Sequence, residues 1–302
     1  MSSTLLQLVT QATQEMGLTV PTTVVGSTTT DTIQELGLIN AVGNELARGY
    51  DWQFLVQQYL TQVSFTTVTA TSTTGSSTLT AVSSTVGLDT TYGIAGLGLN
   101  QACYVTSVGA NTLGLSQPAI ANNTGATYTL TKVKYAMPSD WDRQIDRTHW
   151  DKSRHWEMLG PESPQQWEWL ISGYISTGPR IRYRIFGNYF QIWPFIGVAD
   201  TIGFEYLSQN WVLASAATTP SKSSFTVDTD TCIFPDRLMV LGLKLKYFEI
   251  KGFDTTALYR DYTSQLDIAK SNDHGSPTLS MNPRLSSVLI GWENIPDSNY
   301  GT

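Results

Sequence analysis

Residues 135–170 read YAMPSDWDRQIDRTHWDKSRHWEMLGPESPQQWEWL and hold five of the chain's 9 Trp. Acidic and basic residues alternate through this stretch instead of forming a block. Large rings with a polar edge, mixed with Arg, are typical of well-packed protein interfaces. A local aromatic core beneath a loop would have the same composition. We expect the flanking segments to hold the stretch in place, and we expect three of its rings to contact partner proteins: Trp141, Trp150 and Trp156.

The overall composition indicates one large domain or two ordinary ones in a chain of 302 residues. Charged residues make up only 14% of the chain, which suits a protein in constant contact with neighbours. The net charge of −7 argues against binding of nucleic acid through bulk attraction. No apolar run reaches the length of a membrane span, and the N-terminus lacks the positive region of a secretory signal. Cys103 and Cys232 lack metal-ligand spacing, so we expect unpaired buried thiols in a reducing cytosol.

Helical periodicity marks the start of the chain. The apolar residues of Thr4–Met16 share one helical face, and Ser2 or Ser3 is expected to cap its start. Asp31 is expected to open a second helix, with Gln34 as the partner in a capping box. Both helices are therefore expected to bury one face against other elements.

Two further helices are predicted near the C-terminus. Pro235 opens the first and Gly252 ends it, and Asp254 is expected to cap the second. Gly37 and Gly43 of the second N-terminal helix are expected to let a partner helix come close. The front and back helices are natural partners in one helical bundle. The last helix is expected to bury Leu258, Tyr262, Leu266 and Ala269.

Between the helices, residues 62–131 are mostly Thr, Ser, Gly, Ala and small apolar residues. Short β-prone runs alternate with turn residues, which favours an inserted module that resembles a small β-sandwich or barrel. A flexible linker is the alternative reading. The runs at Val63–Val68 and Thr127–Val133 both read as strands that can pair where the module leaves and re-enters the chain.

A β meander is predicted after the Trp-rich stretch. Arg180–Phe186 alternates strictly, Gly187-Asn188 is a two-residue turn signal, Tyr189–Trp193 returns, and Thr201–Leu207 makes a third strand. One face of the first strand is basic, and we expect it to pair with acidic residues of a neighbour more readily than with phosphates. Its residues are Arg180, Arg182 and Arg184.

Residues 276–302 show no periodic element but carry an apolar patch between prolines. Such a tail is expected to dock on a neighbouring protein. The predicted anchors are Leu285, Val288, Leu289, Ile290 and Trp292.

The sequence contains no P-loop, GxSxG, HExxH or metal-spaced Cys/His cluster, and we expect no catalytic activity, no cofactor and no bound metal. Three weaker patterns stay open as alternatives. The first is a metal site, the second a pair of carboxylates for glycoside hydrolysis, and the third a sugar-binding platform in the module. Their residues are Asp146, His149, Asp151 and His155 for the metal; Asp140, Asp142, Asp146 and Glu157 for hydrolysis; and Tyr92, Tyr104 and Tyr128 for the platform.

Six motifs in order carry a resemblance to a known family. They are LGLINAVGNELARGYDWQFL (36–55), YAMPSDWDR (135–143), LGPESPQQWEWL (159–170), RYRIFGNYFQIWP (182–194), FEYLSQNWV (204–212) and FPDRLMVLGLKLKYFEIKGFD (234–254). Together they resemble the head-to-tail adaptor (connector) proteins of short-tailed bacteriophages and related tailed phages. The resemblance covers nearly all of the chain outside residues 70–127, which look like an extra domain.

The resemblance implies a structural protein of the virion, assembled in the host cytoplasm. Such adaptors form a ring, commonly of twelve copies, that binds the portal protein on one side and the tail nozzle or tail tube on the other. Viral DNA passes through the axial channel without sequence-specific binding. An acidic protein suits a channel wall along which DNA must slide.

We therefore predict an α+β fold in five segments. Residues 1–61 supply the N-terminal helices of a bundle, 62–131 the inserted β module, and 132–232 the Trp-rich centre and β meander. Residues 233–275 supply the C-terminal helices, and 276–302 form an extended docking tail.

Overall fold

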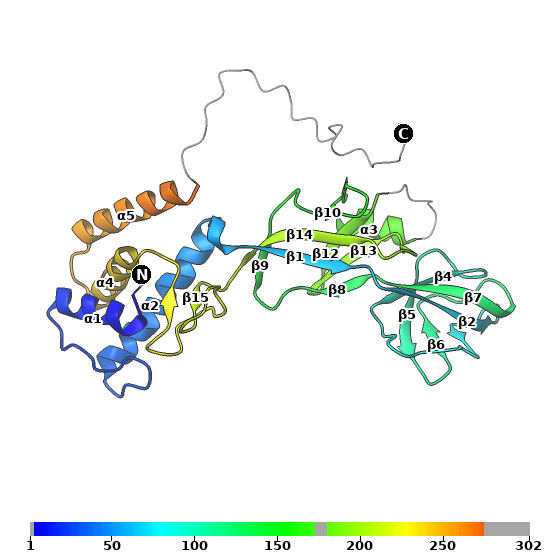
Figure 1. Cartoon of the computed structure of the whole chain (residues 1–302), viewed down its shortest axis with the longest axis horizontal. Helices are drawn as coiled ribbons and strands as arrows, with labels where there is room; N and C mark the ends of the chain where they lie inside the picture. The colour runs from blue at the N-terminus through cyan, green and yellow to red at the C-terminus, as the bar shows by residue number, and fades with distance from the viewer. Residues whose placement is uncertain (1–2, 173–179, 275–302) are drawn as a thin grey trace, which may run out of the picture. The chain divides into compact units, whose positions relative to one another are not determined.

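The computed structural model describes residues 3–172 and 180–274 (Figure 1). Within these residues the chain forms two compact units, each assembled from segments that are distant in sequence. Unit 1 contains residues 3–57, 140–144 and 206–274, and unit 2 contains residues 58–139, 145–172 and 180–205. The fold is mixed α+β, with helices concentrated in unit 1 and a strand-rich unit 2.

The first helix of unit 1, α1 (Leu5–Met16), begins at a different cap from the expected one. Thr4 and Gln7 form a full capping box, because the Thr4 hydroxyl accepts from the Gln7 amide and the Gln7 side chain accepts from the Thr4 amide. Ser3 instead donates its amide and its hydroxyl to the Asp236 carboxylate. The prediction of a Ser2 or Ser3 cap was therefore wrong, since a long-range acceptor engages Ser3.

The second helix, α2 (Thr30–Gly49), starts one residue before the expected Asp31. Its N-cap residue is Thr29, which makes no side-chain capping bond, so the predicted capping box of Asp31 and Gln34 is absent. A 3₁₀ turn, η1 (Gln53–Leu55), follows the helix. The Trp52 ring lies buried beside this turn and donates its Nε1–H to the Leu46 carbonyl at 2.7 Å.

Helix α4 (Asp236–Lys251) is the centre of the helical part of unit 1. It packs against α1, α2 and α5 (Thr256–His274), and Gly242 receives Val42 of α2 at close range. Gly252 ends it in the left-handed conformation, as expected, with φ of 75°. Helix α5 is less buried than predicted. Of the four residues expected on its inner face, Ala269 is buried, whereas Leu258, Tyr262 and Leu266 are only half-buried.

Trp211 joins the strands of unit 1 to α2. The ring is 0% exposed, and an added Cβ at Gly43 would lie 2.1 Å from it. Its Nε1–H donates to Asn44 Oδ1 at 3.0 Å. Gly43 therefore admits an indole ring, not the partner helix that we expected, while Gly37 faces open space. Strands β15 (Val212–Leu213) and β16 (Thr231–Cys232) pair next to this ring.

The inserted module of unit 2 is a six-stranded, nearly closed sheet that resembles a barrel. The strand order is β2-β7-β4-β5-β6-β3, and a bridge between Thr71 and Thr80 brings the last strand back to the first. Its strands are β2 (Phe65–Ser72), β3 (Thr78–Leu79), β4 (Tyr92–Gly96), β5 (Cys103–Val108), β6 (Leu113–Leu115) and β7 (Asn123–Lys132). The predicted pairing of the two ends is confirmed, because β2 and β7 form an antiparallel ladder.

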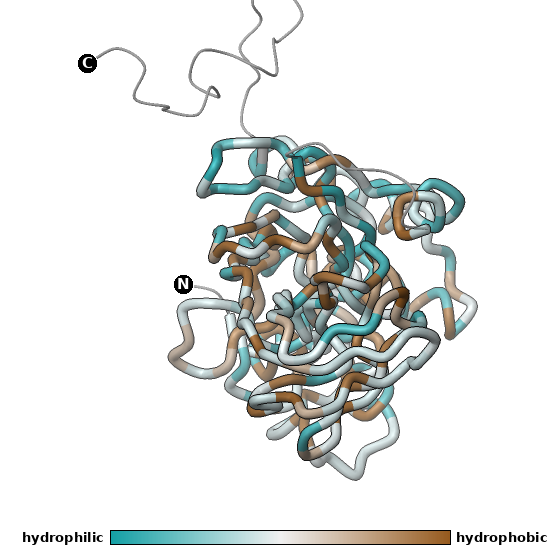
Figure 2. Tube along the Cα trace, turned by 90° about the vertical axis from the view of Figure 1, so that its right-hand side faces the viewer, coloured by the Kyte–Doolittle hydropathy of each residue, from teal (hydrophilic) through white to brown (hydrophobic). Residues whose placement is uncertain are grey.

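The module has its own core, which excludes the flexible-linker reading. Its interior includes Leu79, Ile94, Cys103, Leu113 and Leu130, each buried completely. Figure 2 shows much of the module's tube in pale, nearly neutral colours with brown positions between them. Aliphatic and Tyr side chains thus fill the interior, while many of the Thr and Ser residues lie outside.

The rest of unit 2 differs from the predicted meander in one connection. Strands β12 (Arg182–Phe186) and β13 (Tyr189–Trp193) form the expected hairpin through Gly187 and Asn188, both at positive φ. Strand β13 then pairs with β8 (Lys134–Ala136), not with β14 (Thr201–Ser208). The predicted strand at Thr201–Leu207 is confirmed as β14, but its predicted place in the meander was wrong, because β14 lies between β1 and β10 in another sheet. That path is β1 (Val56–Gln62), β14, β10 (Trp150–Asp151) and β11 (Trp156–Glu157), and β9 (Trp141–Gln144) also pairs with β14.

The close packing at Gly43 yields a prediction with a matched control. Gly43→Ala places a methyl group inside the Trp211 ring and should lower the free energy of unfolding of unit 1 by about 1–3 kcal/mol. Gly37→Ala, on the same helix with open space around it, should raise it by up to about 1 kcal/mol. Urea denaturation followed by tryptophan fluorescence measures both. Equal effects of the two substitutions would contradict the packing role of Gly43.

Candidate functional site

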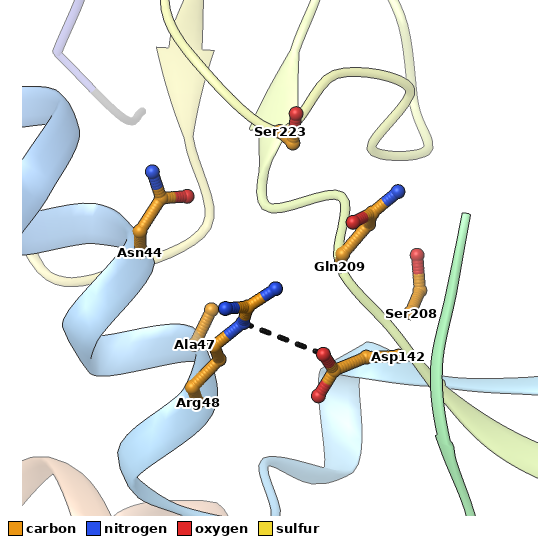
Figure 3. Close-up of a pocket in the computed structure, with 7 residues that line it drawn as sticks. All are labelled: Asn44, Ala47, Arg48, Asp142, Ser208, Gln209 and Ser223. Carbon is orange, nitrogen blue, oxygen red and sulfur yellow. Dashed lines mark ion pairs between the residues drawn. The ribbon is translucent and has the colours of Figure 1, made fainter.

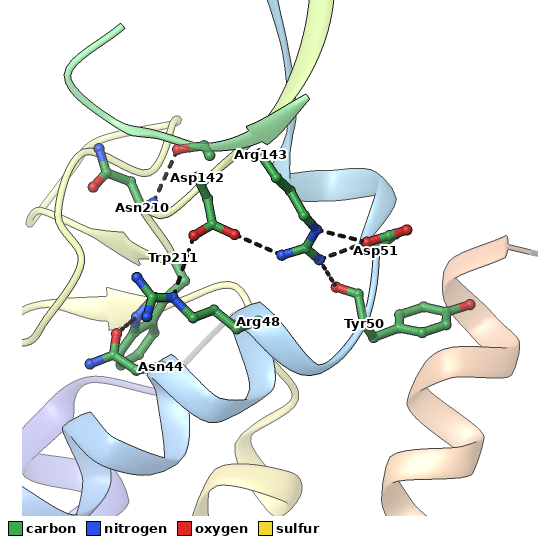
Figure 4. A network of polar contacts seen from close by, with 9 residues as sticks. Asn44, Arg48, Tyr50, Asp51, Asp142, Arg143, Asn210 and Trp211 are labelled. Carbon is green, nitrogen blue, oxygen red and sulfur yellow. Dashed lines mark hydrogen bonds and ion pairs between the residues drawn. The ribbon is translucent and has the colours of Figure 1, made fainter. Parts of the chain in front are cut away.

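A network of charged and polar groups connects four segments of unit 1 (Figure 4). Arg143 of β9 is its centre and contacts Asp51 at 2.6 Å, Asp142 at 2.7 Å and the Tyr50 carbonyl at 3.3 Å. Asp142 also pairs with Arg48 of α2 at 3.4 Å. Because each carboxylate faces a guanidinium, the network is nearly neutral and fixes β9 against the end of α2.

A cavity of about 210 Å³ opens beside this network (Figure 3). Arg48 brings a positive charge to the cavity wall, and 70% of its side chain is exposed. The lining residues are Asn44, Ala47, Arg48, Asp142, Ser208, Gln209 and Ser223. Hydrogen-bond donors and acceptors are mixed here, and the Ser208 hydroxyl already donates to Asp140 at 2.6 Å. The cavity is thus lined mainly by polar side chains, and the bond to Asp140 engages one of its hydroxyl groups.

Asp140 and Asp142, two candidates for glycoside hydrolysis, have structural partners. Asp140 accepts hydrogen bonds from the Tyr206 hydroxyl and the Ser208 hydroxyl, and Asp142 pairs with two arginines. A general acid must instead hold a proton beside the leaving group. The contacts therefore give both carboxylates a role in holding β9, and they do not support the hydrolysis hypothesis.

The Trp residues of the opening stretch divide between core and surface. Trp167 of α3 (Pro164–Ile171) is buried, while Trp169 is 51% exposed. The three rings predicted to contact partners, in strands β9, β10 and β11, are half-buried. Trp141 Nε1 has no hydrogen-bond partner among the described residues. The partner contacts of Trp141, Trp150 and Trp156 stay a prediction.

The arginines of the meander have different surroundings. Arg182 pairs with Glu162 of the same chain at 2.7 Å, so its acidic partner is internal and not a neighbour's residue. Arg184 lies over the Phe186 ring, with Cζ 4.9 Å from the centroid. Arg180 lies two residues before the start of β12 and is half-buried. The three side chains therefore do not act as one basic stripe.

The strand register builds a polar row that the sequence did not reveal. Arg184 of β12 lies opposite Gln191 of β13, and Gln191 lies opposite Lys134 of β8. Lys134 Nζ is 5.5 Å from the centroid of the Tyr104 ring. With residues of α3 this row lines a second cavity of about 270 Å³. Exposed Phe186 extends the face, and its aromatic ring and Arg184 belong to the residue types that are enriched at protein interfaces.

The proposed metal ligands are not brought together. No group of three or more His, Cys, Asp or Glu able to hold a metal occurs in residues 3–172 and 180–274. Asp151 accepts hydrogen bonds from the amides of Ser153 and Arg154, which orders the turn after β10. His155 has a positive φ of 56° and an exposed side chain.

His149 is part of an aromatic stack inside unit 2. Its ring lies 4.0 Å from Tyr183 and 4.9 Å from Phe204 in stacked geometry, and the residue is 1% exposed. Neither ring nitrogen has a hydrogen-bond partner among the described residues. Burial lowers the pKa of His149 to about 4, so the ring packs as a neutral aromatic group.

The pKa of His149 predicts acid sensitivity. The folded pKa lies below the ordinary value of 6.5, so the stabilising contribution is complete above pH 6.5 and is lost as pH falls toward 4. In this window the wild type should lose up to about 1.4 kcal/mol of its free energy of unfolding for each unit of pH decrease through His149, and His149→Phe should abolish that loss. Urea denaturation at pH 7 and pH 5 measures it. His155→Asn is the control, because it removes an exposed imidazole and leaves the His149 stack intact. The same flattening in both variants would contradict the prediction.

The third alternative, a sugar platform, has little support. Tyr92 and Tyr128 are buried in the module, and of these three rings only Tyr104 lines the second cavity.

The predicted tail anchors, from Leu285 to Trp292, lie outside the described residues. Both cysteines are buried and unpaired, as expected. Of the helices in the described ranges, none combines the length and apolar character that a bilayer span requires.

Comparison of the sequence with models of known protein families gave no match, and neither did comparison with curated proteins.

Proposed function

We propose that this chain is one subunit of a head-to-tail adaptor ring, which joins the portal to the tail at one capsid vertex of a phage. The observation that carries the proposal is the ordered set of six motifs that resembles this family. The α+β fold, with N- and C-terminal helices in one compact unit, is compatible with it. The proposed role is structural and involves no catalysis.

In this proposal the helices of unit 1 act as a bundle that lines or surrounds the DNA channel. The net charge of −7 supports it, since an acidic wall repels the phosphate backbone and lets DNA slide. A ring also requires each copy to present two different, complementary surfaces. The face with Phe186, Arg184 and Lys134 is proposed as one of them, because aromatic rings and cations meet on it in unit 2.

The first test measures the mass of the purified chain, alone and mixed with its candidate portal ring. A mass of about 33 kDa alone is expected, followed by joining of the portal in a fixed, twelve-fold stoichiometry. Phe186→Ser should weaken formation of the twelve-fold ring on the portal at least tenfold while the far-UV spectrum stays unchanged, because it removes an exposed aromatic ring from the proposed contact face between copies. Val86→Ser, at a 91% exposed apolar residue of the module, is the matched control and should assemble normally. A chain that does not bind the portal ring would overturn the adaptor proposal.

A second test concerns the predicted docking tail. Deletion of residues 276–302 should leave the melting temperature nearly unchanged but prevent incorporation into particles, because the apolar anchors would be lost. Complementation of a phage that lacks this gene measures incorporation. Normal particles assembled with the truncated chain would rule out docking by the tail.

A further inference from the structure

A cavity of about 440 Å³ lies in unit 1 between the end of α1 and the first turns of α2. Its walls come from the loop after Gly17 and from the N-terminal part of α2. They combine apolar surface from Leu18, Val20 and Pro21 with the hydroxyl groups of several Thr and Ser residues. A cavity of this size is typical of small-ligand sites, and it is far larger than the space of one water.

A buried carboxylate lines this cavity. Glu35 is 2% exposed, and its side chain has no hydrogen-bond or ion-pair partner among the described residues. Burial, with a smaller contribution from Asp31, raises the pKa of Glu35 to about 7. Acidic residues are almost never fully buried unless they are paired. An unpaired buried carboxyl group either holds a proton or pairs with a cation, and the cavity beside Glu35 leaves room for a cation.

A second carboxylate lies one helical turn away, at the mouth of the cavity. Asp31 lines the cavity, and its side chain is 56% exposed. Lys251 of α4 pairs with it at 3.7 Å. The cavity therefore has a buried carboxyl group at Glu35 that ionises near neutral pH and a partly neutralised carboxylate at Asp31.

The loop that forms the outer wall is held in place by Asp228. The Asp228 carboxylate accepts hydrogen bonds from the amides of Val24 and Val25 and from the Thr23 hydroxyl. Burial alone would raise the pKa of Asp228, but the bonds from Val25, Thr23 and Val24 lower it, so the anchor stays ionised. A wall fixed in this way preserves the cavity instead of collapsing onto Glu35.

We propose that this cavity binds an organic cation, a guanidinium or primary ammonium group on an aliphatic stem. The cation pairs with Glu35, and the stem lies against Leu18, Val20 and Pro21. The hydroxyl groups accept the remaining N–H bonds. A divalent metal ion fits less well, because Ca²⁺ takes 6–8 oxygen ligands and two carboxylates one turn apart leave most of them to water.

The test is calorimetric titration of the full-length protein with agmatine, which carries a guanidinium on a four-carbon stem. Binding is expected, and Glu35→Gln should weaken it at least tenfold. Glu45→Gln removes a charge from an exposed residue of the same helix and should leave the affinity unchanged. Equal affinities of the wild type and Glu35→Gln would overturn the proposal, as would a lack of binding at millimolar agmatine.

The pH dependence provides an independent readout. A cation binds the ionised carboxylate, so affinity should be about tenfold weaker at pH 6 than at pH 8, and Glu35→Gln should abolish this dependence. Asp31 and Lys251 are charged groups at this end of α2. Asp31→Asn should keep a pH dependence but shift its midpoint to lower pH, because Asp31 helps to raise the pKa of Glu35. Affinity that does not vary with pH would contradict binding at Glu35.

Two further titrations distinguish the sources of such a cation. A blocked Gly-Arg-Gly peptide that binds as tightly as agmatine would identify a protein side chain as the ligand, and weaker binding of the peptide would identify a free small molecule. Both results support an organic cation. Saturable binding of Ca²⁺ or Mg²⁺ that excludes agmatine would replace the proposal with a metal site.

Discussion

Unit 1 depends on the packing of one indole ring against one glycine. Trp211 is completely buried on α2 at Gly43, where no side chain with a Cβ fits without movement. Its edge meets Phe225, and its Nε1–H is satisfied by Asn44 on the same helix. The ring thus fixes the segment that leads into β15, and the network around Arg143 then fixes β9 against the same helix. A large apolar area and a satisfied donor together give this contact both strength and a single geometry.

Each unit contains a buried ionisable group whose pKa is shifted by burial. His149 in unit 2 gives up its charge and packs among aromatic rings, whereas Glu35 in unit 1 lines a cavity. Burial disfavours the charged form of both, so the pKa of the base falls and that of the acid rises. Acidification therefore destabilises unit 2 through His149 and favours the folded state of unit 1 through Glu35. The two units should differ in their response to pH for reasons that reside in single side chains.

The contact face of unit 2 arises from strand register. Arg184, Gln191 and Lys134 are far apart in the sequence, and only the pairing of β12, β13 and β8 places them in one row. The charged ends of Arg184 and Lys134 lie over the Phe186 and Tyr104 rings, so cations and aromatic rings meet on this face. Arg182, two residues from Arg184, is engaged by Glu162 instead. Sequence alternation alone assigns both arginines to the same face and cannot separate their roles.

The sequence by itself determined the features that rest on local chemistry. The glycines that end α1 and α4, the Gly187-Asn188 turn and the boundaries of the β module follow from backbone preferences within a few residues. Tertiary structure alone decided the partner of β14, the ring that covers Gly43, the acceptor that engages Ser3, and the burial of Glu35 and His149. Each of these depends on a contact between residues far apart in the chain, where packing and desolvation outweigh local propensity. Local preferences limit the choice of elements, and long-range contacts select which surfaces they bury.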